Sequence, residues 1–269
     1  MLETKLLKFN SAKSGYLLFG SKKKKWELMK ELRTTPLKLC GEAMKQEKAA
    51  KYLGDFLSEA GLADSVSTTV KKRKGMVSRA IFDDCRSHVV GGIVAGLEIW
   101  ESTILPMLLN NAECWLDIPA DTINILEKMQ LQFVKTLLSV GSGCPSPLLL
   151  SETGMLLMEY RILQRKLLFL HHIVHLPDTA LAKEILNVQI ELGLPGLFKE
   201  CQAFLIRFGI HNLKLYTKKQ FKKLVKEKIS YLNKEHIIEQ VKKKGYKKLI
   251  LKQCIRIASN SRVTSMISK

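Results

Sequence analysis

After the first sixty residues of the sequence, apolar side chains recur at the spacing of amphipathic helices, and glycines or prolines separate the helical stretches. This pattern predicts helices over residues 64–86, 93–114 and 119–140, with Asp64 capping the first. Pro106 is expected to kink or interrupt the second, because proline lacks the amide hydrogen that a helix needs. The chain is therefore predicted to be mainly α-helical.

The densest apolar stretch, residues 155–176, follows a Gly- and Pro-rich linker at residues 141–147 and stops at Pro177. We expect it to form the central core helix, since proline ends a helix and the stretch is apolar on most sides. Asp178 is expected to cap the next helix. Residues 195–209 should form another, because a proline opens the stretch and a glycine closes it.

The final segment is amphipathic and basic. Thr217 and Gln220 have the spacing of a capping box, which predicts the start of a helix. Asn233 is expected to cap a further helix that ends near Gly245. Basic helices are thus expected at the C-terminal end.

The first sixty residues lack a helical period and contain short apolar runs bounded by turn-forming residues. Strands are expected at residues 16–19, 37–40 and 51–57, with a polar connection at residues 41–47. Such short strands favour a small antiparallel sheet or hairpin, which would hardly be stable alone.

The charge of the chain is large and unevenly distributed. Forty-four Lys and Arg residues face 25 Asp and Glu residues, a formal net charge of +19. Residues 1–90 carry +9, residues 91–210 carry −4 and residues 211–269 carry +14. Two basic ends flanking a near-neutral middle make a polyanion the first partner to expect.

The lysines of the two ends are clustered. A single basic run is usually a solvated surface, but several in one chain favour phosphate contacts, and aromatic rings such as Trp26 and Tyr246 are suited to stacking on unpaired bases. The candidate nucleic-acid-binding residues are Lys22, Lys23, Lys24, Lys25, Lys71, Lys72, Arg73, Lys74, Lys222, Lys223, Lys243 and Lys244.

No enzyme motif is visible in the sequence. GxSxG, P-loop and GxGxxG patterns are absent, and the adjacent pair Asp83-Asp84 lies in a helical pattern, where neighbouring side chains diverge by about 100°. His171 and His175 share a helical face as a zinc pair would, but no third ligand is evident. We interpret the acids as a solvated face and the histidines as core or surface residues, and we expect no metal ligands.

The six cysteines form no CxxC pair, and the chain has neither a signal core nor an apolar run of membrane-spanning length. These observations predict an intracellular protein, nuclear or cytoplasmic, that does not contact the membrane.

Two motifs near the N-terminal end are distinguished by their order and spacing. Asn10-x-x-Lys13-Ser14 is followed by a strand-like run, and Tyr52-Leu53-Gly54 lies about forty residues further on. They resemble a palm motif and the primer-grip hairpin of the reverse transcriptase of non-LTR retrotransposons of the long interspersed element type, at the spacing that the family shows.

The resemblance continues over roughly residues 5–185. The segments 99–106 and 110–115 resemble the family's thumb, where a helix ends in Leu-Pro and leads to a Glu-x-Trp segment. Residues 126–133 and 152–162 fit the helices that follow.

The resemblance implies a fragment of the enzyme rather than the whole. The aspartate motifs that bind the catalytic Mg²⁺ in this family lie upstream of the Asn-x-x-Lys-Ser segment, so Mg²⁺ would belong to the missing catalytic half and this chain has no cofactor of its own. Although the family is an RNA-directed DNA polymerase, the chain alone is expected to be inactive.

The implied organisation has four parts: a palm remnant with the primer-grip hairpin (residues 1–61), thumb-like helices (62–144), a helical continuation (145–210) and a basic helical extension (211–269). By resemblance, Tyr52, Leu53 and Gly54 would sit at the primer terminus, and the basic helix at residues 71–74 would lie along template–primer phosphates. Alternatively, Tyr52 and Leu53 form the apolar core of the hairpin.

Three functions follow as hypotheses. The first is a retroelement fragment that contacts RNA or DNA of a template–primer. The second is a helical protein-interaction module, whose apolar middle packs against a partner such as the missing polymerase half. The third is a nucleic-acid-binding module retained without enzymatic activity.

Overall fold

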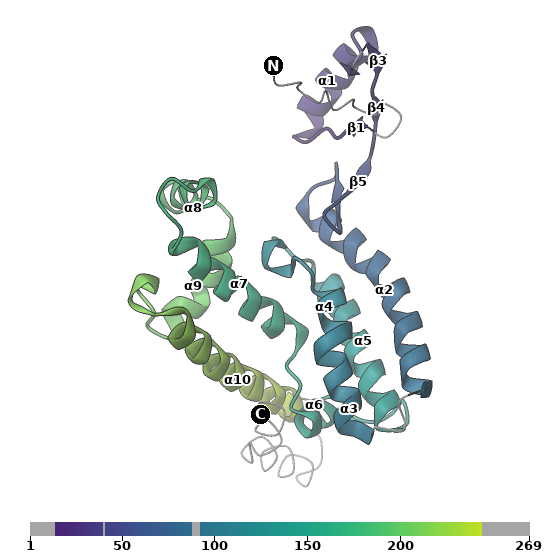
Figure 1. The fold of residues 1–269 in the computed structure, drawn as a ribbon, viewed down its shortest axis with the longest axis vertical. Coiled ribbons are helices and arrows are strands. Elements are labelled where there is room, and N and C mark those ends of the chain that lie inside the picture. Colours follow the sequence, from purple (N-terminus) through teal and green to yellow (C-terminus); the bar gives the residue numbers. More distant parts are fainter. Residues whose placement is uncertain (1–13, 40, 88–91, 244–269) are drawn as a thin grey trace, which may run out of the picture. The chain divides into compact units, whose positions relative to one another are not determined.

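The computed structural model describes residues 14–39, 41–87 and 92–243, without the side chains of residues 79–87 (Figure 1). The described chain is mainly helical, with short strands near its N-terminal end, which confirms the predicted fold class. It divides into two compact units, Met1–Thr69 and Val70–Lys269, each described by itself below.

The N-terminal unit combines one helix with pairs of short strands. Strand β1 pairs in parallel with β4, whereas β2 pairs with β3 and β5 pairs with β6 in antiparallel fashion. The parallel pair corrects the prediction of a purely antiparallel sheet, because an unforeseen helix carries the chain back between β1 and β4. The elements are β1 (Gly15–Tyr16), α1 (Lys22–Thr34), β2 (Lys38–Leu39), β3 (Glu42–Ala43), β4 (Lys45–Gln46), β5 (Ala49–Tyr52) and β6 (Asp55–Ser58).

Helix α1 replaces a segment that was expected to be non-helical. Its N-cap is Ser21, whose hydroxyl accepts from the amide of Lys24 at 3.4 Å. The residues that follow are mostly lysine, glutamate, leucine and methionine, all good helix formers. No residue of α1 is buried in the described structure. Its sequence lacks a clear apolar period because little of its surface is covered.

The segment predicted as one strand at residues 51–57 is a hairpin of two strands. Leu53 and Gly54 form the turn with φ of 47° and 92°, as a two-residue type I′ turn requires. The turn reverses the chain between Tyr52 and Asp55, which pair with each other. The polar connection at residues 41–47 likewise contains two strands, β3 and β4.

The start of helix α2 (Leu62–Ser87) fixes the outer edge of the hairpin. Ser65 accepts a hydrogen bond from the amide of Ser58 at 2.9 Å, and Thr69 accepts one from the amide of Phe56 at 2.8 Å. Because Ser65 and Thr69 are four residues apart, they share a helical face and satisfy alternate amides of β6. The helix therefore covers an edge that would otherwise be free to pair.

The larger unit is a helical assembly around α7. Helix α7 packs against α10, α9, α8 and α5, so the apolar stretch before Pro177 is the central core helix, as predicted (Figure 1). The elements are α3 (Gly92–Ile99), the π-helical turn η3 (Trp100–Ile104), α4 (Leu105–Leu108), the 3₁₀ turn η4 (Ala112–Cys114), α5 (Ala120–Leu137), α6 (Ser146–Thr153), α7 (Met158–Val174), α8 (Leu181–Glu191), α9 (Leu197–Arg207), the 3₁₀ turn η5 (Leu213–Leu215) and α10 (Lys218–Lys243).

Pro106 changes the helical register as expected, although through a π turn. The amide of Leu105 donates to the carbonyl of Trp100, one residue further back than in an α-helix. Trp100 is fully buried there and stacks on Phe133 with ring centroids 4.7 Å apart. The rod ends at Leu108 rather than near residue 114, because Asn111 adopts a left-handed conformation with φ of 57°.

The predicted caps were correct at one helix and wrong at three. Asp64 does not precede its helix but lies in the first turn of α2, which already begins at Leu62. The Thr217 amide donates to the Gln220 side chain at 3.0 Å and the Gln220 amide donates to the Thr217 hydroxyl at 3.3 Å, which confirms the capping box. Helix α8 is instead capped by Ala180, while Asp178 pairs with Lys183 at 2.8 Å. The linker predicted at residues 141–147 is also shorter than expected, because residues 146 and 147 already belong to α6.

Asn233 caps no helix, because α10 continues straight through it. Its side chain is buried, accepts from the amide of Leu157 at 2.9 Å and donates to the carbonyl of Met155 at 3.4 Å. The polar residue therefore ties the middle of α10 to the start of α7, and packing outweighs its preference for helix ends.

Candidate nucleic-acid interface

The turn of the β5–β6 hairpin presents two large side chains to solvent. Tyr52 is 63% exposed and Leu53 is 77% exposed, so the alternative that they form the core of the hairpin is wrong. Leu53 has a left-handed backbone, which is uncommon for a residue with a branched side chain. Gly54 at φ of 92° has the freedom that this turn needs. The Tyr-Leu-Gly motif thus forms an exposed tip.

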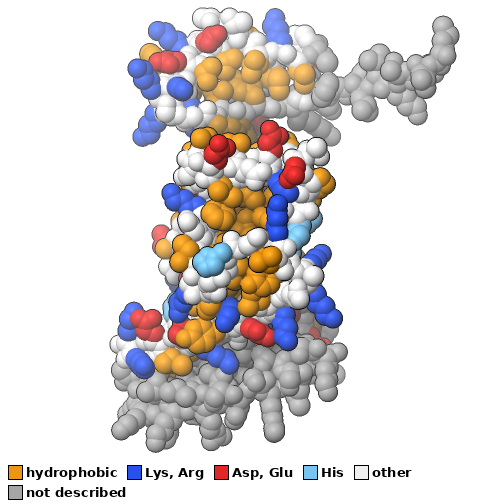
Figure 2. Space-filling view, turned by 90° about the vertical axis from the view of Figure 1, so that its left-hand side faces the viewer, with side chains coloured by type: hydrophobic (Ala, Val, Ile, Leu, Met, Phe, Trp, Pro, Cys, Tyr) orange, Lys and Arg blue, Asp and Glu red, His pale blue; other side chains and the backbone are white. Residues whose placement is uncertain are grey.

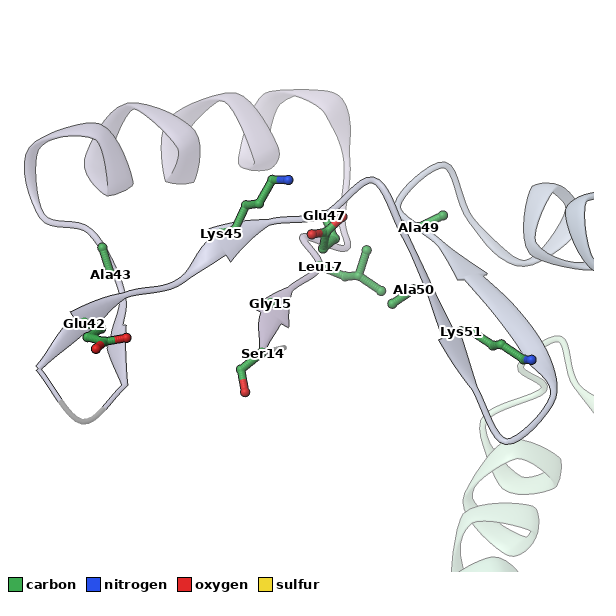
Figure 3. Close-up of a pocket in the computed structure, with 10 residues that line it drawn as sticks. All are labelled: Ser14, Gly15, Leu17, Glu42, Ala43, Lys45, Glu47, Ala49, Ala50 and Lys51. Atoms are coloured by element: carbon green, nitrogen blue, oxygen red, sulfur yellow. The ribbon is translucent and has the colours of Figure 1, made fainter. Parts of the chain in front are cut away.

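Of the other proposed palm residues, Asn10 and Lys13 lie outside the described residues. Ser14 lies at the edge of an open hollow of about 640 Å³ bordered by β1, β3, β4 and β5 (Figure 3). Gly15 lines it as well, and a Cβ there would come within 2.8 Å of the Glu47 side chain, so the close pairing of β1 with β4 needs glycine. Lysines and glutamates both border the hollow, which gives it no single charge preference.

Helix α1 carries the first basic cluster at its N-terminal end. Lys22, Lys23 and Lys24 are exposed, whereas Lys25 is half-buried and donates to the backbone carbonyl of Glu59. Three of the four lysines are therefore available to a ligand, and Lys25 holds the helix against the end of the hairpin.

The second cluster, on α2, splits into exposed and buried residues. Lys71, Lys72 and Lys74 are exposed, but Arg73 is 4% exposed. Its guanidinium donates to the carbonyls of Leu108 at 3.1 Å and Asn110 at 2.8 Å, and lies 5.5 Å from the ring centroid of Trp115.

Arg73 is therefore enclosed by its own fold, unlike the lysines beside it. A helix turns by about 100° per residue, so consecutive residues cannot all face solvent. The arginine satisfies the carbonyls left free where the helical rod ends, and its role is structural.

Helix α10 carries the densest basic surface. Lys218, Lys219, Lys222, Lys223 and Lys226 are all exposed and alternate along the helix with the buried Phe221 and Val225. The first eleven residues of the helix contain six lysines and one glutamate, a formal charge of +5. The helix dipole places a partial positive charge at the N-terminal end of α10, and the lysines add their own charges to it. This end of α10 therefore has a strongly positive potential.

The remaining candidates on this helix differ in environment. Lys243 is exposed and pairs with Glu239 at 2.9 Å, an arrangement in which the carboxylate already neutralises part of its charge. Lys244 lies outside the described residues. Lys228, which was not among the candidates, lies 5.3 Å from the ring centroid of Phe208.

The two histidines that share a helical face differ in environment, since His175 is exposed and His171 lies in the core. His171 is buried, stacks on Phe221 with ring centroids 4.6 Å apart and donates from Nε2 to the carbonyl of Tyr216 at 2.8 Å. Burial lowers the pKa of His171 and favours the neutral ring, and this effect outweighs the hydrogen bond to Tyr216, which acts in the opposite direction. Within the described part of the chain, no group of three His, Cys, Asp or Glu residues is placed to hold a metal ion.

A buried carboxyl, Glu127 on α5, was not foreseen from the sequence. It accepts from the amide of Met158 at the start of α7, and burial raises its pKa to about 7, with the Glu159 carboxylate adding to the effect. Its second oxygen is buried and has no hydrogen-bond partner. A lone glutamate in a lysine- and leucine-rich helix carries no sequence signal of burial.

Comparisons with protein-family models, with curated proteins and with solved structures give no match. No described helix combines the length and apolarity needed to cross a membrane.

Proposed function

We propose that this chain binds RNA or DNA mainly through phosphate contacts, as the primer-grip and thumb portion of a reverse transcriptase of the non-LTR retrotransposon type. The single observation that carries the binding proposal is the exposed lysine surface of the first turns of α10, with its formal charge of +5. The resemblance of Tyr52-Leu53-Gly54 to the primer grip supports the family, since the motif forms an exposed hairpin tip.

Charge of this kind predicts a specific dependence on salt. Each phosphate that a lysine neutralises releases counterions, so the logarithm of the affinity falls with the logarithm of salt concentration by about 0.7 to 0.9 per contact. In the proposed function, the full chain binds single- and double-stranded oligonucleotides, inside the cell and in the nucleus or the cytoplasm.

The binding proposal is tested by fluorescence anisotropy with the full chain over a range of salt concentrations. K222A/K223A should weaken binding to all sequences similarly and reduce the salt slope by between one and two contacts. K128A/K199A is the matched control, because it removes two exposed lysines from α5 and α9 and the same net charge. Equal effects of the two pairs would show that net charge alone, rather than the α10 surface, attracts the ligand.

The catalytic part of the proposal has a separate test. The chain by itself is proposed not to extend a primer, because the aspartates that hold the catalytic metals in the resembled family are not among its motifs. Metal-dependent DNA synthesis by the purified chain in a primer-extension assay would contradict this.

A second candidate function, protein interaction, is favoured by α8. Leu181, Ile185, Val188 and Leu192 follow each other at intervals of four, three and four residues, and all are exposed by 44% or more. This apolar stripe lies opposite the buried Leu186 on the same helix. Binding of a partner there would be insensitive to salt, which separates it from phosphate binding.

A further inference from the structure

Trp26 on α1 is the one tryptophan of three that stands in solvent. It is 64% exposed, whereas Trp100 and Trp115 are 0% and 4% exposed. Large aromatic side chains are usually buried where a core exists to receive them. An indole left in the open therefore points to a ligand surface. Figure 2 shows hydrophobic side chains gathered on a surface of the N-terminal unit, with both basic and acidic side chains around them.

The side chains around Trp26 on α1 are basic. Lys22 and Lys30 lie one turn before and one turn after it on the same face, and Arg33 follows at the second turn. The ammonium of Lys30 is 5.3 Å from the centroid of the indole ring. Glu27 and Glu31, the two acids of the helix, point about 100° and 140° away from the tryptophan.

The same end of the helix has a positive potential from its backbone. Ser21 caps only the Lys24 amide among the first amides, and no acid occupies the first turn. Four consecutive lysines add their charges to the positive end of the dipole, an arrangement that destabilises the free helix and is relieved by an anion. Charge and aromatic surface thus lie together on one face.

We propose that this face of α1 is a binding site for single-stranded nucleic acid, with an unpaired base stacked on Trp26 and flanking phosphates on Lys22, Lys23 and Lys30. The inference rests on the proposed function and specifies where the ligand must be unpaired. The rise from Lys22 to Lys30 is about 12 Å, with Trp26 midway, so the two ammonium groups lie on either side of a base stacked on the indole. An exposed ring stacks on any base, so the site is tolerant of sequence.

Tryptophan fluorescence of the full chain reads this site directly, since Trp26 is the exposed indole. A thymidine homopolymer should quench the emission, and an abasic strand of equal length and charge should bind more weakly and quench less. W26A should weaken binding of the homopolymer by roughly 5- to 100-fold and leave abasic binding unchanged, whereas W26F should keep most of the affinity. L28A is the matched control, because Leu28 is 42% exposed on another face of the same helix.

The outcomes are distinguishable. Equal affinity of wild type and W26A for the homopolymer would overturn the stacking site, and if that binding stayed salt-dependent the proposed function would stand. No binding to any strand would overturn both. Quenching by polyglutamate as strong as that by the homopolymer would show an acidic-peptide site instead, and would overturn the assignment to nucleic acid.

Discussion

The two units of this chain are held together differently. The C-terminal unit encloses an apolar core that extends from Leu167 on α7 to Leu232 on α10. In the described part of the N-terminal unit, the buried residues are Ser58, Ser65, Val66 and Thr69, three of them polar. The first unit is therefore held chiefly by hydrogen bonds and short ladders, and its aromatic and apolar residues remain on the surface.

This difference bears on where ligands bind. A unit that buries little apolar surface gains little free energy from folding by itself. A partner that covers such a unit therefore increases its stability strongly. The exposed hairpin tip and Trp26 both belong to this unit. The basic surface of α10, in contrast, is carried by a helix whose buried residues belong to the apolar core.

The largest expected difference in the free energy of unfolding comes from replacing one tryptophan in each unit by alanine. Trp100→Ala should destabilise the C-terminal unit by about 3–5 kcal/mol, because it empties a fully buried site stacked on Phe133. Trp26→Ala should change stability by less than about 0.5 kcal/mol. Denaturant unfolding followed by circular dichroism measures both, and a large loss in Trp26→Ala would mean that α1 is covered by something in solution.

A pH dependence should belong to the C-terminal unit. The pKa of Glu127 is raised to about 7 in the folded chain, so the folded state binds its proton more tightly than the unfolded state does. Stability from this group is present in full below the unfolded pKa of 4.5 and falls as pH rises to about 7, by on the order of 3 kcal/mol.

The matched variant is Glu127→Gln, which keeps an acceptor for the Met158 amide but does not ionise. Thermal unfolding between pH 4.5 and 8 should show a shallower fall for this variant and a more stable protein at pH 8. Parallel curves for the two proteins would mean that Glu127 is not buried in solution.

Asn233 tests how α10 is joined to α7. Asn233→Ala should cost about 2–3 kcal/mol, since it leaves the buried amide of Leu157 without a partner and opens a cavity. Asn233→Asp keeps the acceptor and should lose the donated bond to Met155. Chemical denaturation ranks the two, and oligonucleotide affinity of the folded variants should stay unchanged, because Asn233 is buried and lies seven or more residues from the exposed lysines at 218–226.

A smaller loss of stability than at Asn233 is expected at a hydrogen bond of the N-terminal unit. Thr69→Val removes the hydroxyl that accepts from the Phe56 amide and should cost about 1 kcal/mol, felt mainly as faster hydrogen exchange at Phe56 and Ser58. Exchange at α7 should not change. If exchange accelerated throughout the larger unit as well, the two units would unfold as one.

The sequence predicted those parts of the fold in which neighbouring residues decide the outcome. The capping box at Thr217, the stop at Pro177 and the interruption at Pro106 follow from local stereochemistry. Asn233 and Asp178 were predicted to be caps because their side chains favour helix ends. In the structure Asn233 instead bonds the distant amide of Leu157, and Asp178 pairs with Lys183. Helix α1 was missed because an unburied helix shows no apolar period.

The candidate site shows the same limit. The lysine clusters are visible in the sequence, and the exposure of those on α10 follows from its amphipathic pattern, whereas the helix that carries the α1 lysines was not foreseen. The burial of Arg73 depends on carbonyls that come from residues 108 and 110, which no pattern near residue 73 reveals. The burial of Glu127 likewise depends on residues distant in the sequence, because the start of α7 packs against α5 there.

The π turn at Trp100–Ile104 has a consequence for sequence change. A π turn holds one residue more than the α turn it replaces, so it is the place in this rod where a single residue can be lost without breaking the helix. Such a deletion would rotate everything before it by about 100° and swing Leu97 away from the core. The extra residue of the π turn therefore sets the rotation of α3 about the helix axis relative to Leu105 and Pro106. Related chains are expected to preserve the length of this turn more strictly than its composition.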